Sequence, residues 1–122
     1  MSTIKVDNLQ TTSGAGQYTA KTWAHFTAYS SFSLQGSGNV SSVTDNSTGN
    51  FRVNFSTALS ASNYAGIATA GNDATSYADG NQNTDHVAMM GQMNTNNVYV
   101  ASVDADDGAP DDPQYMGVII VI

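Results

Sequence analysis

The chain has 122 residues, which suits one domain with one modest core, because two cores would each be too small to be stable. Its net charge of −7, with only three Lys and Arg residues, predicts no binding to nucleic acid or to an anionic membrane. The lack of cysteine excludes disulfides and thiolate metal sites. We also expect no signal peptide and no membrane span, because no segment has the required apolar run.

The composition predicts an all-β fold. All ten acidic residues are Asp, and the polarity comes from Ser, Thr, Asn and Gly, which favour strands and turns over helices. No window sustains apolar residues at helical spacing beyond two turns. Short apolar segments instead recur at the spacing of an antiparallel β-sandwich of about seven to nine strands.

The N-terminal residues 1–17 are predicted to be separate from a β-sandwich domain at 18–122. Residues 3–9 form a short strand, and the small residues of 11–17 form a flexible connector. A strand on such a connector is a candidate for docking on another subunit or protein, although an ordinary edge strand of the same sheet fits equally well.

The next predicted strands are aromatic and then interrupted by glycine. In residues 18–28, Trp23 and His25 share one face, and Ala24 and Phe26 share the other. Residues 32–34 form a short strand or turn segment, which the glycines of 36–38 are predicted to end.

The clearest prediction is a hairpin at residues 39–57. Phe51, Val53 and Phe55 alternate with polar residues, as in a strand with one buried face. A bulge would reconcile Val40 and Val43 with one face. The connecting segment is rich in Asp and Asn, and Gly49 tolerates positive φ, so a compact turn is expected.

Four more strands and two polar loops complete the domain. The small side chains of residues 64–71 indicate close approach of another layer or chain. A long polar loop covers 72–85, a second hairpin has strands at 86–94 and 97–105, and an acidic loop covers 104–113. Residues 115–122 are apolar on both faces, so this strand is expected to be central in a sheet or buried between subunits.

Lys21, Trp23 and Phe26 form a K-x-W-x-x-F motif, which precedes the NVSSVTDNSTGNFRVNF hairpin. With residues 3–9 and the closing strand, these motifs resemble tail-fibre-like proteins of bacteriophages, including phages of marine bacteria. The resemblance covers most of the chain. Its departures lie mainly in the turn or on exposed faces, at His25, Ser47, Asn50 and Arg52.

The resemblance implies a virion structural protein at or near the tail, often trimeric, and host attachment is one role it suggests. We expect a homotrimer that contacts other virion proteins through its N-terminal strand. The alternatives are a capsid decoration (cement) protein and a carbohydrate-binding or carbohydrate-active module.

The sequence predicts no catalytic site and no obligatory cofactor. His25 and His86 are the only histidines, and the adjacent Asp85 and His86 would point to opposite faces of a strand. No serine lies in a G-x-S-x-G segment after a strand. We therefore expect a protein that is not an enzyme.

Two loops carry the candidate binding residues. The acidic loop contains the best metal ligands, since calcium prefers clustered carboxylates, although a solvated acidic loop is the favoured interpretation. These residues are Asp104, Asp106, Asp107, Asp111 and Asp112. In the long loop, an aromatic face and polar groups suit a host-surface glycan, against the alternative of a hydrophilic loop without a ligand. These residues are Tyr77, Asp79, Asn81 and Asn83.

Overall fold

The computed structural model describes residues 2–3, 12–14, 20, 22–71, 86–105 and 107–121. Within these residues there are eight strands and no helix, which confirms the predicted all-β fold and the strand number. The strands are β1 (Thr22–Thr27), β2 (Ser33–Gly38), β3 (Val40–Ser47), β4 (Asn50–Phe55), β5 (Ala65–Gly71), β6 (His86–Gly91), β7 (Asn97–Asp104) and β8 (Tyr115–Val121).

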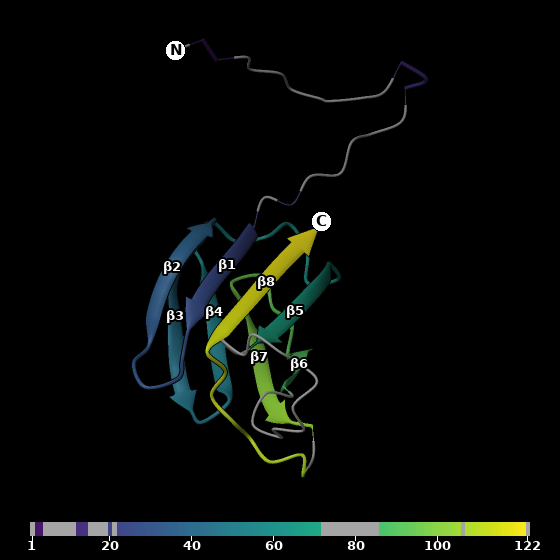
Figure 1. Ribbon diagram of the computed structural model, residues 1–122. Helices are drawn as coiled ribbons and strands as arrows, with labels where there is room; N and C mark the ends of the chain where they lie inside the picture. The colour runs from purple at the N-terminus through teal and green to yellow at the C-terminus, as the bar shows by residue number, and fades with distance from the viewer. Residues whose placement is uncertain are drawn as a thin grey trace.

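The strands form two antiparallel sheets of four strands each, ordered β2-β1-β8-β5 and β3-β4-β7-β6. Figure 1 shows the first sheet in front of the second, with β8 between β1 and β5. The fold is therefore a β-sandwich. The predicted central position of the C-terminal apolar strand is confirmed, since both edges of β8 are paired.

The core lies between the two sheets and is built mainly from inward-facing side chains of β1, β3, β4, β7 and β8. Phe26 of β1 and Phe51 of β4 are fully buried, and their rings pack edge to face with centroids 5.1 Å apart. Val118 and Ile120 of β8 face the same interior, since alternate residues of a strand point to one side. Burial of these apolar side chains is the main force that holds the sheets together.

The predicted hairpin is present as β3 and β4, and it contains the predicted bulge. The register shifts between Val40 and Ser42, so Val40 and Val43 both reach the core. Gly49 has φ +66° in the turn. The second predicted hairpin is also present, as β6 and β7.

The prediction that the glycines of residues 36–38 end a strand is wrong. Strand β2 continues to Gly38 and pairs with β1. A Cβ on Gly36 would lie 3.3 Å from the indole of Trp23, so the ring covers this position closely. Glycine here accommodates an aromatic neighbour within the sheet rather than interrupting it.

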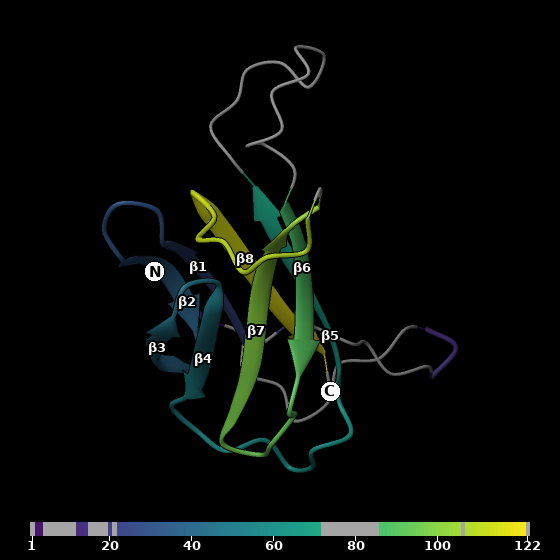
Figure 2. The ribbon, with the colours of Figure 1, turned by 90° about the horizontal axis from the view of Figure 1, so that it is seen from below.

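The small residues of β5 allow the two sheets to meet closely along one side. A Cβ on Gly66 would lie 2.6 Å from Cε of Met90 in β6. The predicted close approach of another layer at this strand is therefore confirmed. Figure 2 shows β5 beside β6, where the two sheets come together.

Candidate functional site

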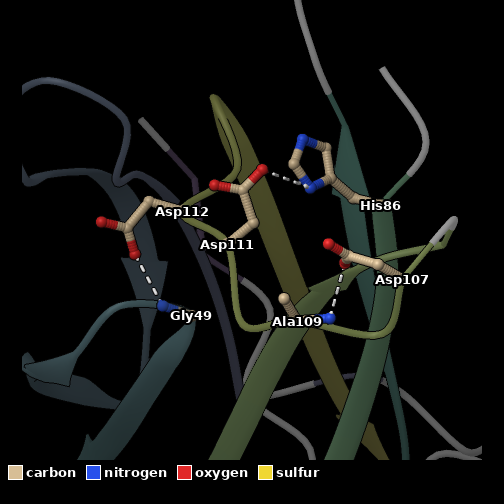
Figure 3. Close-up of polar contacts among 6 residues, drawn as sticks. All are labelled: Gly49, His86, Asp107, Ala109, Asp111 and Asp112. Atoms are coloured by element: carbon tan, nitrogen blue, oxygen red, sulfur yellow. Dashed lines mark hydrogen bonds and ion pairs between the residues drawn. The ribbon is translucent and has the colours of Figure 1, made fainter. Parts of the chain in front are cut away.

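The acidic loop between β7 and β8 lies against the turn of the β3–β4 hairpin (Figure 3). The amide of Ser102 donates to the carbonyl of Gly49 at 2.8 Å, and the amide of Asp111 donates to the carbonyl of Ser102 at 3.1 Å. Gly49 is packed so closely that a Cβ would lie 2.3 Å from the carbonyl oxygen of Ser102. These contacts attach the loop to the second sheet.

Two of the predicted metal ligands organise this loop. Asp112 Oδ1 accepts a hydrogen bond of 2.7 Å from the amide of Gly49, and Asp107 Oδ1 accepts one of 2.8 Å from the amide of Ala109. A carboxylate that accepts a backbone N–H forms a charge-assisted bond, which is stronger than a neutral one. These two aspartates therefore have a structural role.

Asp111 faces a histidine that the sequence did not associate with it. Its Oδ2 lies 3.9 Å from Nδ1 of His86, whose side chain is only 4% exposed. Nδ1 of His86 has no hydrogen-bond partner within the described residues. At 3.9 Å the two groups attract each other as an ion pair only when the imidazole is protonated. No local pattern links them, because residue 86 begins β6 and residue 111 follows β7.

The described residues do not bring the acidic side chains together as a metal cluster. Within them, no group of three or more His or Asp side chains has the arrangement needed to hold an ion. Figure 3 shows Asp112 directed to Gly49 and Asp111 to His86. Asp104 ends β7 opposite His86, and Asp106 lies outside the described residues. The solvated acidic loop favoured from the sequence and its alternative, a calcium site, both stay predictions.

The predicted glycan-binding residues Tyr77, Asp79, Asn81 and Asn83 lie outside the described residues, as does most of the N-terminal segment 1–17. Their roles in binding and attachment stay predictions.

The most prominent surface feature is an apolar row on the outer face of the β2-β1-β8-β5 sheet. Trp23 pairs with Ile119, and Ile119 pairs with Ile67, so the three side chains cross β1, β8 and β5 side by side. They are 41%, 51% and 68% exposed, respectively. We call these three residues the apolar row. Contiguous large apolar side chains at a surface commonly mark an interaction site.

The surroundings of the apolar row are also uncharged. None of the four strands of this sheet contains Asp, Lys or Arg. His25 and Tyr115 stack beside the row, with ring centroids 6.0 Å apart. A shallow cavity of about 380 Å³ lies between Trp23, Ile67 and Ile119. The sequence placed Trp23 and His25 on one face, but the alignment with Ile67 and Ile119 depends on the pairing of strands far apart in the chain.

The fold and this surface define an antiparallel β-sandwich with one uncharged, apolar outer face. The chain matches no protein-family model, no curated protein and no solved structure. Within the described residues, no helix is long and apolar enough to cross a membrane.

Proposed function

We propose that the protein is a virion structural component, a small tail-fibre-like appendage of a bacteriophage that assembles as a homotrimer through the apolar row. The observation that carries the assembly is the exposure of Trp23, Ile67 and Ile119 on a sheet without charged residues. The virion context and the number of three subunits come from the resemblance of the K-x-W-x-x-F and hairpin motifs to tail-fibre-like proteins.

Charge favours a second copy of the chain as the occupant of this face. Copies with a net charge of −7 repel each other, so they associate best through a surface without carboxylates. A basic partner would instead be attracted to acidic side chains, which this sheet lacks. Burying the exposed part of each large side chain of the row contributes on the order of 1 to 2 kcal/mol.

Light scattering after size exclusion tests the assembly. The wild-type chain is expected to be trimeric at micromolar concentration, and Ile119→Asp is expected to be monomeric because its carboxylate would be buried without a partner. Val87→Asp is the matched control, since Val87 is similarly exposed at 46% but lies on β6 in the other sheet. A monomeric wild-type protein, or equal effects of both substitutions, would refute assembly through the apolar row.

Removal of residues 1–17 tests the attachment role. The truncated protein is expected to fold and to be lost from particles, whereas normal incorporation would contradict an N-terminal anchor. Imaging of intact particles distinguishes a tail appendage from the alternative, a capsid decoration protein, because the two occupy different positions. The same apolar face would serve either assembly.

The function we propose is not enzymatic. A carbohydrate-active enzyme would need an acid and a base at defined separation, and in this chain Asp would have to provide both. Turnover of a host polysaccharide by the purified protein would contradict this proposal.

A further inference from the structure

A second surface feature lies on the opposite sheet and differs in chemistry from the apolar row. A groove of about 390 Å³ crosses the outer face of β4, β7 and β6, which lie side by side in Figure 2. The outward-facing residues that line it are Asn50, Met89, Gly91, Gln92, Tyr99 and Ala101. This volume is near the lower end of the range of small-molecule sites, roughly 300 to 1,000 Å³.

Strand register explains the shape of the groove. Tyr99 of β7 pairs with Gly91 of β6, where an added Cβ would meet no atom within 4 Å. The missing side chain leaves open space beside the tyrosine ring. In the next outward row, Ala101 pairs with Asn50 on one side and with Met89 on the other. These two rows of side chains form the floor of the groove. They are about 7 Å apart along the strands, and each extends about 10 Å across three strands, so the floor accommodates one ring-sized ligand.

The polar groups of the groove stand at its ends. Asn50 begins β4, and Gln92 follows the last residue of β6. Neither side-chain amide has a hydrogen-bond partner within the described residues, and each offers two N–H donors and one acceptor oxygen. An aromatic and apolar floor between two amides is therefore available to a ligand that has both an apolar face and a polar rim.

We infer that this groove binds a neutral pyranose sugar. The C–H face of a pyranose packs on an aromatic ring, and its hydroxyl groups exchange hydrogen bonds with amides. Arg52 of β4 pairs with Tyr99 in the same outward row, so its guanidinium stands beside the groove and offers further N–H donors to sugar hydroxyl groups. The chain as a whole is strongly acidic, which disfavours an anionic ligand. A purely apolar ligand would leave the amides without partners, at a cost of about 1 to 3 kcal/mol for each buried group.

The inference gives a site to the host attachment that the sequence resemblance suggests, and it rests on the proposed virion function for its biological meaning. The groove and the apolar row lie on different sheets, so assembly through the row leaves the groove accessible to a host surface. The residues that line the groove are not those of the predicted glycan-binding loop that contains Tyr77.

Saturation-transfer NMR on the full chain tests the site, with methyl glycosides of glucose, galactose, mannose and N-acetylglucosamine at about 10 mM, a concentration suited to millimolar affinity. At least one sugar is expected to receive saturation. Gly91→Leu fills the space beside Tyr99 and is expected to weaken binding at least about tenfold, or 1.4 kcal/mol. Tyr99→Phe keeps the aromatic ring and removes only the hydroxyl group, so this variant is expected to retain binding. Loss of binding in Tyr99→Phe would contradict packing of the sugar on the ring face.

Gly71→Leu is the matched control. Gly71 ends β5 as Gly91 ends β6, and a Cβ there also meets no atom within 4 Å, but it lies on the other sheet. Binding is expected to be unchanged in this variant. The inference fails if no sugar of the panel binds, or if Gly91→Leu binds as well as Gly71→Leu. Light scattering reports assembly separately, so a failed groove and a failed trimer are distinguishable.

Discussion

Replacing Gly49 by alanine tests the contact between the hairpin turn and the acidic loop. The new Cβ would lie 2.3 Å from the carbonyl oxygen of Ser102 and 2.8 Å from the amide nitrogen of Asp111. Both neighbours are backbone atoms, which cannot rotate away as a side chain would. The turn and the loop must therefore separate, and the hydrogen bonds between them must lengthen or break.

The expected loss of stability follows from these contacts. Alanine at φ +66° costs about 1 kcal/mol by itself. Separation also weakens two hydrogen bonds. The one from the Ser102 amide to the Gly49 carbonyl is worth about 1 kcal/mol, and the one from the Gly49 amide to the Asp112 carboxylate is worth about 1.5 to 3 kcal/mol. We expect Gly49→Ala to lower the free energy of unfolding by about 3 to 6 kcal/mol, a large part of the total for a domain.

Thermal unfolding followed by far-UV circular dichroism, at one fixed protein concentration, measures this effect. Gly108→Ala is the control, since Gly108 has φ +70° but nothing within 4 Å of an added Cβ. Gly108→Ala is expected to lower the free energy of unfolding by only about 1 kcal/mol, the cost of placing alanine at positive φ. Equal melting temperatures for the two variants would refute the argument, because the close packing at Gly49 would then contribute nothing.

Three further predictions follow from the loop and the core. Asp112→Ala removes the carboxylate that accepts the Gly49 amide and is expected to cost about 1.5 to 3 kcal/mol in denaturant unfolding, so a change within error would exclude a structural role. Burial raises the pKa of Tyr64, although a backbone hydrogen bond to Asn94 partly opposes it. The unfolded chain then loses this proton first, so stability is expected to fall above about pH 10, and less so in Tyr64→Phe; equal alkaline unfolding of both proteins would contradict this. Added calcium is expected to leave the melting temperature unchanged, because Asp107 and Asp112 already accept backbone hydrogen bonds, and a rise that a chelator reverses would contradict this.

Local patterns in the sequence predicted most of the fold correctly. Alternation of Phe51, Val53 and Phe55 identified β4, and the conformational freedom of Gly49 identified its turn, because both depend only on neighbouring residues. The prediction failed at Gly36, where glycine usually suggests a break. Strand β2 continues through Gly36 because the indole of Trp23, on the adjacent strand, covers this position.

The candidate sites were less predictable than the strands, because they depend on contacts between distant segments. The sequence grouped the aspartates of the acidic loop as metal ligands, but the structure directs Asp112 to Gly49 and Asp111 to His86. In the same way, the apolar row and the groove at Tyr99 each require the register of three strands. Only Trp23 and His25, which share one strand, could be placed together from spacing alone.

The central position of β8 makes the apolar row depend on strands from distant parts of the chain. Strand β8 separates β1 from β5 and contributes Ile119 to the apolar row, although it follows both of these strands in the chain. A nascent or truncated chain without β8 therefore cannot display the complete row, although its β3–β4 and β6–β7 hairpins can form. Under the proposed assembly, we expect a chain to associate through the row only after β8 has paired with both β1 and β5.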